Sequence, residues 1–283
     1  MQKIFSLLAF TLFSVHSLAD DQVSPWLLLD NFEHNQLTQW QKADTQNQTK
    51  PKIENPQITE IRQEAQQNQI NHYLIKKPAQ DGVVGNRKAL TFSPLPKAIE
   101  VGETYTFYLR INVESFPNNH AFGISNLAAE EIKKQAYNAF EPTLRVTDKA
   151  ESNGYKNDGA LMVKIDSEDK YRQYANVQNY QAKRSAKPLQ IGSWYQVWFV
   201  VNNALVSEGG QTYDVYMQGG EFTNQTLVYK GAKFRMKREQ ALIYFFATCN
   251  TGPHKQAYGN GGLKYDDIYM SKGLNLSLPA LKF

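Results

Sequence analysis

The chain has 283 residues and a formal net charge of +4 at pH 7. Its 31 Lys and Arg residues are spread along the sequence, whereas a nucleic-acid-binding protein concentrates them in one stripe, so no nucleic-acid partner is expected. The sequence has no P-loop, dinucleotide fingerprint, Cys/His zinc array or Gly-x-Ser-x-Gly elbow, and no organic cofactor is expected. The single cysteine, Cys249, cannot form an intramolecular disulfide, and its apolar surroundings indicate a buried small side chain.

The N-terminus predicts a signal peptide over residues 1–19. Lys3 supplies a positive start, residues 4–15 form an apolar run, and Ser17 and Ala19 are small residues at the positions that a signal peptidase reads. The run is shorter than the roughly 20 residues of a membrane-spanning helix, and no later segment comes close. No cysteine follows the expected cleavage point to carry a lipid. We therefore expect a soluble protein, secreted or periplasmic, that does not span a membrane.

The first half of the remaining chain predicts a hairpin and a long strand. Residues 57–62 and 70–75 have β character and are separated by a polar turn. Residues 104–113 alternate strictly, so that the odd-numbered side chains from Tyr105 to Val113 share one face of a strand. The even-numbered side chains of this strand are expected on the face away from the core.

One short helix is expected near residues 126–138, in a loop between strands. Asn126 is a residue type suited to the N-cap. Glu130 and Glu131 lie near the positive end of the helix dipole, and two lysines follow toward the negative end.

The second half of the chain predicts further strands separated by Gly- and Asn-rich turns. Residues 194–202 alternate as residues 104–113 do, with Tyr195 and Phe199 directed inward. No internal repeat and no Pro/Ser-rich linker divides residues 20–283. Many short strands without alternating helices predict a single all-β domain, a two-sheet antiparallel jelly-roll sandwich. The other expected strands are residues 160–165, 212–217, 242–248 and 263–270.

Four segments resemble concanavalin A-like lectin/glucanase domains. They are Leu27–Glu33, Gly192–Asn203 with its WYQVWFVVNN sequence, Tyr213–Gly219 with YDVYMQG, and Tyr265–Met270 with YDDIYM. The resemblance implies a jelly roll in which the first and last strands lie side by side. It also implies a polysaccharide-directed function, either binding or cleavage.

The same resemblance implies a structural Ca²⁺ ion that ties the chain ends together. The residues that match by position are Glu33, after the first strand, and Asp267, in the terminal Asp-Asp pair. Two carboxylates and loop carbonyls would provide the hard oxygen ligands that Ca²⁺ requires. The alternative is that these acids are solvated or paired with Lys264 and Lys272.

The sequence leaves catalysis open. The segment 166–169 lacks the carboxylate spacing of glucanases, so a polysaccharide lyase is favoured over a glycoside hydrolase if the protein is an enzyme. β-Elimination needs a group that neutralises the uronate carboxylate and a base for the C5 proton. Residues 59–63 and 243–247 resemble two alginate lyase strands, but Phe246 stands where those enzymes have Lys. The candidate catalytic residues are His120, Arg110, Arg145 and Tyr108.

Polar and aromatic side chains on the non-core strand faces are the candidates for holding a glycan. Aromatic rings stack on sugars, and cations attract anionic ones. The alternatives are an ordinary solvated sheet face and, for Trp198, burial under another layer. The candidate binding residues are Tyr108, Arg110, Asn112, Arg145, Lys164, Trp198 and Tyr216.

Three functions therefore remain from the sequence: a secreted polysaccharide-binding protein, a lyase acting on a uronic-acid polymer, and a non-catalytic structural or adhesion protein of the cell envelope. The missing catalytic motifs favour the first, and the domain length and basic strand faces favour the second. No pattern predicts an oligomeric state.

Overall fold

The computed structural model describes residues 25–66, 69–80, 83, 87–151, 155–168, 173–251 and 261–281. The predicted signal peptide lies outside these ranges. Within them, no helix has both the length and the apolar character needed to cross a membrane.

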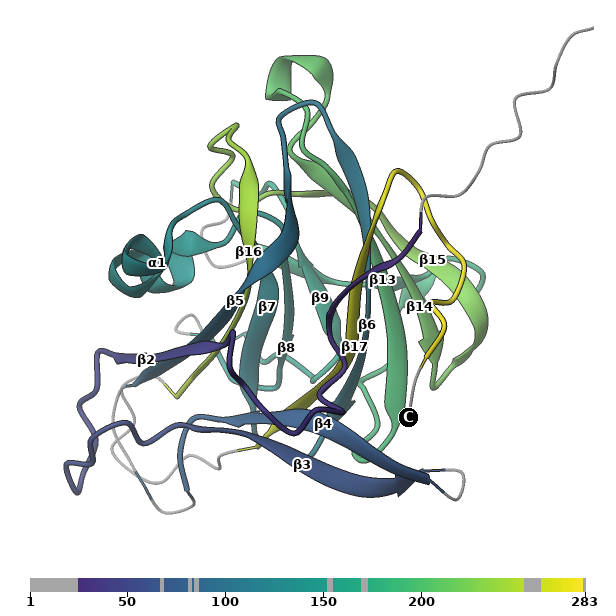
Figure 1. The fold of residues 1–283 in the computed structure, drawn as a ribbon. Coiled ribbons are helices and arrows are strands. Elements are labelled where there is room, and N and C mark those ends of the chain that lie inside the picture. Colours follow the sequence, from purple (N-terminus) through teal and green to yellow (C-terminus); the bar gives the residue numbers. More distant parts are fainter. Residues whose placement is uncertain are drawn as a thin grey trace, which may run out of the picture.

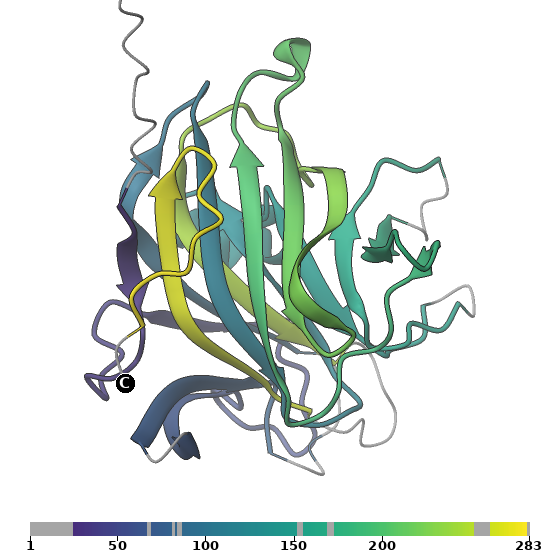
Figure 2. The same ribbon diagram turned by 90° about the vertical axis from the view of Figure 1, so that its right-hand side faces the viewer.

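Two antiparallel sheets pack face to face, which confirms the jelly-roll sandwich (Figure 1 and Figure 2). Sheet A contains, in spatial order, β15 (Phe222–Lys233), β14 (Thr212–Gly219), β13 (Trp194–Asn202), β6 (Thr104–Val113), β17 (Leu263–Lys272), β4 (Gln69–Lys77) and β3 (Ile58–Gln66), and β1 (Leu27–Asp30) also pairs with β17. Sheet B contains β10 (Tyr174–Asn176), β9 (Leu161–Lys164), β8 (Thr143–Thr147), β7 (Asn119–Ser125), β16 (Leu242–Asn250), β5 (Lys88–Ile99) and β2 (Gln41–Thr45). A small separate pair comprises β11 (Gln178–Asn179) and β12 (Arg184–Ser185), and a short 3-10 turn, η2, spans Val206–Glu208.

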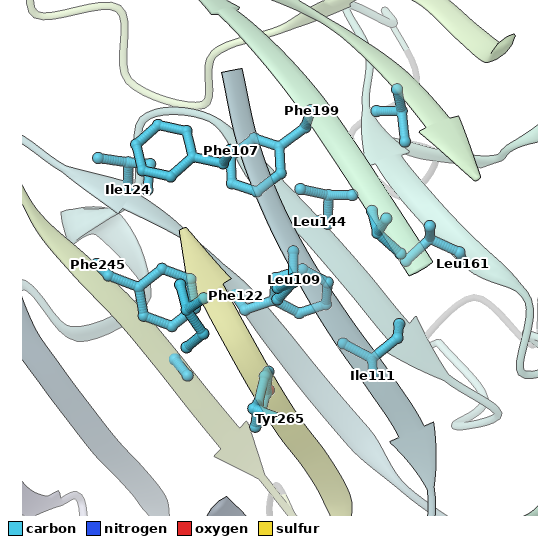
Figure 3. Packing of buried hydrophobic residues seen from close by; sticks show 14 of the residues in the cluster. Phe107, Leu109, Ile111, Phe122, Ile124, Leu144, Leu161, Phe199, Phe245 and Tyr265 are labelled. Carbon is cyan, nitrogen blue, oxygen red and sulfur yellow. The ribbon is translucent and has the colours of Figure 1, made fainter. Parts of the chain in front are cut away.

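The core fills the space between the two sheets. Phe107, Leu109 and Ile111 of β6 point into it, as the alternation predicted (Figure 3). The ring of Phe107 stacks on Phe199 with centroids 4.9 Å apart, and the ring of Phe122 from sheet B meets the Tyr265 ring edge-on at 5.6 Å. Cys249 is fully buried, as expected. Apolar burial on this scale is the main source of stability in such a sandwich.

The strand pairings confirm the predicted order of the chain ends. β1 runs antiparallel to β17, with Leu27 opposite Met270. The β3–β4 hairpin pairs from Ile58 opposite Lys77 to its turn. β6 and β13 begin and end at the expected residues.

The helix is shorter than expected. α1 spans Ala129–Gln135 and continues into a 3-10 turn, η1 (Ala136–Ala139). Asn126 does not cap it, because Ala128 occupies the N-cap position and Asn126 Oδ1, the atom that a cap would use, accepts from Arg238 Nη1 at 3.2 Å. Figure 1 shows α1 on the outer side of sheet B. There α1 and η1 bury a small second core against β5, β7 and β16.

The centre of the outer face of sheet A is covered by the C-terminal segment 273–281, called the C-terminal strap. Figure 2 shows this yellow segment folding back across the sheet after β17. Trp198 Nε1 donates to the Ser277 carbonyl at 3.2 Å, and Trp26 Nε1 donates to Ser277 Oγ at 3.2 Å. The strap and Trp26 together remove the central aromatic residues of this face from solvent.

Candidate functional site

The predicted aromatic platform on sheet A is closed. Tyr108 and Trp198 have no exposed surface, and Tyr216 is half-buried beside them. The Tyr108 ring meets the Trp198 ring at 5.1 Å and the Trp26 ring at 6.2 Å. Stacking of a sugar here and catalysis by Tyr108 were therefore wrong predictions. The alternative, that Trp198 is buried under another layer, is confirmed.

Arg110 belongs to a buried ion cluster rather than to a ligand site. Its Nη2 contacts Asp266 Oδ2 at 2.5 Å, and its Nε contacts Asp267 Oδ2 at 2.6 Å. Nη2 also donates to Asn71 Oδ1 at 2.8 Å, and Trp194 lies against the guanidinium at 5.0 Å. The placement of Arg110 against a uronate carboxylate was therefore wrong, because two internal carboxylates already hold it.

The rest of this strand face is equally enclosed. Asn112 is 1% exposed, and Thr106 is fully buried under the strap. A glycan does not reach Asn112 in this arrangement, which corrects its assignment as a binding residue. The alternative prediction, that this face of β6 is an ordinary solvated sheet face, is also wrong, because these side chains are buried.

The two aspartates share one guanidinium, which leaves an excess of buried negative charge. Burial raises the pKa of Asp266, and the neighbouring Asp267 raises it further, while Arg110 opposes both effects. Burial likewise raises the pKa of Asp267 against the opposing charge of Arg110. The cluster therefore retains a proton at higher pH than exposed carboxyl groups do.

Glu33 and Asp267 do not fit the Ca²⁺ site that the sequence resemblance implied. The guanidinium of Arg110 lies against Asp267, with Nε 2.6 Å from Oδ2, so a protein cation already occupies one of the two carboxylate oxygens. Glu33 is engaged by His72, whose backbone N–H donates to Oε1 at 3.0 Å and whose Nδ1 lies 2.9 Å from Oε2. Among the residues described in the structure, no group of three or more His, Cys, Asp or Glu side chains is arranged to hold a metal ion.

A groove opens instead on the outer face of sheet B. Its deeper part is a cavity of about 380 Å³ between the sheet, η1 and the loop after β8, called the basic cavity. Cross-strand register places Thr248, Ala121, Arg145 and Met162 in one row, so the floor runs across the strands. The basic cavity is lined by Lys88, Asn119, His120, Ala121, Gln135, Tyr137, Asn138, Arg145, Lys149, Glu151, Tyr174, Arg235, Thr248 and Asn250.

The basic cavity has a surplus of positive charge. Among its described lining residues, Lys88, Arg145, Lys149 and Arg235 are cationic, and Glu151 is the acid. Burial lowers the pKa of Lys88, and the charge of Arg235 lowers it further. The pKa of Lys149 is lowered by burial and then by Arg145. These cations repel one another, and an anion bound among them would relieve that repulsion.

Two tyrosines form the wall beside the cations. Arg145 lies 5.5 Å from the Tyr174 ring and Arg235 lies 4.5 Å from the Tyr137 ring. Tyr137 Oη donates to Tyr174 Oη at 3.0 Å. Burial raises the pKa of Tyr174 well above its ordinary value, so its hydroxyl is a poor base at neutral pH.

A second cavity of about 290 Å³ continues the groove beyond Arg145, Glu151 and Tyr174, which line both cavities. Its other described lining residues carry no charge, and it is called the neutral cavity. They are Tyr155, Asn157, Met162, Ile165, Ala175, Asn176, Gln178 and Ser185.

Of the sequence candidates, Arg145 lies at the groove centre. His120 lines the basic cavity but its ring is directed inward, and Lys164 is not among the described lining residues of either cavity. His120 follows the inward-facing alternation of Phe122, and its Nε2 lies 3.0 Å from the Gly261 carbonyl. Burial lowers its pKa to about 3, so it is neutral and enclosed rather than a poised base. Lys164 is 7% exposed, and its ammonium donates to Gln173 Oε1 at 2.9 Å and to the Ile165 carbonyl.

Sequence reasoning missed most of the groove lining. Asn119 could have been predicted from the alternation along β7, because it lies two residues before Ala121 and therefore shares the outward face of the strand. Lys149, Glu151 and Arg235 lie outside regular strands, and Tyr137 lies in the short 3-10 turn η1. No period-2 or period-3.6 pattern marks such residues.

No protein-family profile and no curated protein sequence matches the chain. The chain is similar to three solved structures. They are the VIP36 exoplasmic/lumenal domain in a Ca²⁺- and Man2-bound form (9% identity, 85% of this chain and 84% of that chain, TM-score 0.46), peanut lectin with a peptide (8%, 82% and 97%, 0.42), and the catalytic domain of a GH131 β-glucanase from Podospora anserina (9%, 72% and 73%, 0.43). These proteins are concanavalin A-like lectins and glucanases.

Proposed function

We propose that this chain is an exported protein that binds an anionic polysaccharide in the groove on sheet B. The observation that carries the proposal is the basic cavity, where four cationic side chains converge around one acid beside two tyrosine rings. Carboxylate or sulfate groups would pair with the lysines and arginines, and sugar rings would pack on the tyrosines. The signal-peptide pattern of residues 1–19 supports export to where such polymers occur.

Binding is favoured over β-elimination by the state of the available bases. His120 points away from the groove, and burial holds its pKa at about 3. Burial raises the pKa of Tyr174 far above the neutral range. Neither group is matched to proton abstraction near pH 7, where an efficient general base has a pKa close to the working pH.

The test compares binding with cleavage. The mature protein is titrated with polygalacturonate and hyaluronan as anionic polymers and with dextran as an uncharged one, and the absorbance of unsaturated products is followed in parallel. We expect affinity for anionic polymers without an absorbance rise. An absorbance rise would establish a lyase, and equal affinity for dextran would overturn the anionic assignment.

A matched pair of variants on β5 locates the site. Lys88 lines the basic cavity, whereas Lys97 is exposed on the same strand outside it. Lys88→Gln should weaken binding of an anionic polymer about tenfold, which corresponds to about 1.4 kcal/mol. Lys97→Gln removes the same formal charge and should leave the affinity unchanged. If the two variants behave alike, the polymer binds elsewhere.

A further inference from the structure

The two halves of the groove differ in charge. Lys88, Lys149 and Arg235 line only the basic cavity. The described residues that line only the neutral cavity are amide, hydroxyl and apolar side chains. The charge of the lining changes within three neighbouring strands, since Arg145 on β8 and Asn176 on β10 are separated by Met162 on β9.

The boundary between the halves is an ion pair. Arg145 Nη1 contacts Glu151 Oε1 at 2.9 Å, and Asn157 Nδ2 donates to the same oxygen at 2.9 Å. Burial alone would raise the pKa of Glu151, but Arg145 and Asn157 outweigh burial and hold it below its ordinary value. Glu151 is therefore ionised at neutral pH and cancels the charge of Arg145, so the positive region formed by the described lining residues ends at this pair.

The amides of the neutral cavity have their N–H groups engaged within the protein. Asn157 Nδ2 donates to the Lys149 carbonyl at 2.7 Å as well as to Glu151. Asn176 Nδ2 donates to both carboxylate oxygens of Asp158 at 3.1 Å, and Gln178 Nε2 donates to the Asn176 carbonyl at 2.6 Å. Asn157 and Asn176 are left with acceptor oxygens, and Gln178 with its acceptor oxygen and one N–H. Acceptor oxygens suit the O–H and N–H groups of a sugar and repel a carboxylate.

From this asymmetry, and resting on the proposed function, we infer that the groove recognises a polysaccharide in which an anionic sugar alternates with an uncharged one. The anionic residue lies in the basic cavity, and the uncharged residue lies over Asn176 and Gln178. Met162 and Ile165 add an apolar lining that suits an acetamido methyl group. A polymer charged at every residue would place a carboxylate against these acceptors.

The experiment compares three oligosaccharides of equal length by calorimetric titration. Hyaluronan fragments alternate a uronate with an N-acetylhexosamine, oligogalacturonate is charged at every unit, and dextran fragments are uncharged. Charge density by itself favours oligogalacturonate, whereas the proposal expects hyaluronan fragments to bind at least tenfold more tightly. Equal or tighter binding of oligogalacturonate overturns this inference but leaves the proposed function standing. If neither anionic oligomer binds, both the proposed function and this inference fail.

A charge-adding variant gives an independent readout. Gln178→Lys places a cation in the neutral cavity and should raise affinity for oligogalacturonate about tenfold more than affinity for hyaluronan fragments. Gln69→Lys adds the same charge on the exposed end of the β3–β4 hairpin and should change neither affinity. The inference is overturned if Gln178→Lys strengthens both ligands equally or neither.

Discussion

Arg110 and its two aspartates form a buried cluster whose members depend on one another. The guanidinium is 4% exposed, and its partners Asp266 and Asp267 are each 1% exposed. A buried ion pair is worth little relative to an apolar replacement of the whole set, but removal of one partner leaves an uncompensated charge in the protein interior. The functional group that the sequence singled out as a ligand contact is therefore structural.

Arg110→Met should lower the free energy of unfolding by about 3–5 kcal/mol, because both aspartates lose their counterion. Urea unfolding of the wild type and the variant at pH 7 measures this difference in the free energy of unfolding. Arg62→Met is the matched control, since Arg62 is partly exposed in its ion pairs with Glu60 and Glu114 and its loss should change stability by less than about 1 kcal/mol. A loss below about 1 kcal/mol for Arg110→Met would show that the pair contributes little. In the folded fraction, affinity for anionic polymers should be unchanged, since Arg110 lies outside the groove.

His120 predicts a pH dependence of stability. Burial lowers its pKa from 6.5 to about 3, so the unfolded chain binds a proton that the folded chain excludes. The corresponding stability is present above pH 6.5 and is lost as pH falls toward 3. From pH 7 to pH 5 this one group should cost about 2 kcal/mol.

The measurement is urea unfolding of wild type and His120→Gln at both pH values. The variant should lose about 2 kcal/mol less on acidification than wild type, and His34→Gln, at an exposed position, should behave as wild type. Parallel pH dependence in wild type and His120→Gln would contradict the buried neutral state.

At the scale of elements, the C-terminal strap converts an outward sheet face into interior. Leu276 packs into the aromatic cluster of Trp198, Tyr108 and Tyr269. Gln225 Nε2 donates to the Leu276 carbonyl at 2.8 Å, which ties the strap to β15. The segment therefore acts as an additional layer of the fold although it contains no regular strand.

Leu276→Ala should destabilise the protein by about 1–2 kcal/mol, because a half-buried leucine side chain loses its apolar contacts. Leu278 lies two residues later and is 54% exposed, so Leu278→Ala should change stability by less than about 0.5 kcal/mol. Chemical unfolding followed by tryptophan fluorescence measures both, since Trp198 lies directly beneath the strap. Equal effects would mean that the strap does not pack as described.

At the scale of the whole molecule, the outer faces of the two sheets differ in how far they are open to solvent. The centre of the outer face of sheet A is closed by the strap and Trp26, while the outer face of sheet B carries the groove. The junction of the first and last strands is held by the ion pair of Arg110 with Asp267 and by the contacts of His72 with Glu33. Protein groups thus already occupy oxygens of both acids at this edge.

Chelation should consequently leave thermal stability unchanged. A calorimetric melt of the purified protein with and without EDTA, and with added Ca²⁺, is expected to give melting temperatures that agree within about 1 °C, because Arg110 and His72 already occupy oxygens of Asp267 and Glu33. A drop of several degrees in EDTA that is restored by Ca²⁺ would show that a bound ion contributes to this fold. Mg²⁺ at the same concentration serves as the control for ionic strength.

Much of the architecture followed from local pattern. The alternation of Tyr105 to Val113 predicted both the strand and its inward face, and the segments around Leu27 and Tyr265 predicted the pairing of the chain ends. These features depend on the period of two along a strand, which the sequence displays directly. Export and a single domain over residues 20–283 were likewise inferred from the sequence, and both remain predictions.

Only the tertiary structure shows which distant segment covers the outward-facing side chains of each strand. Arg110 and Asp266 are 156 residues apart, and Trp198 and Ser277 are 79 residues apart, so nothing near either residue in sequence shows that it is covered. The groove is built in the same way, from Lys88 on β5, Tyr137 on η1 and Arg235 after β15. Local periodicity determines which way a side chain points, but its exposure depends on which distant segment packs there, and that choice is made only when the whole chain folds.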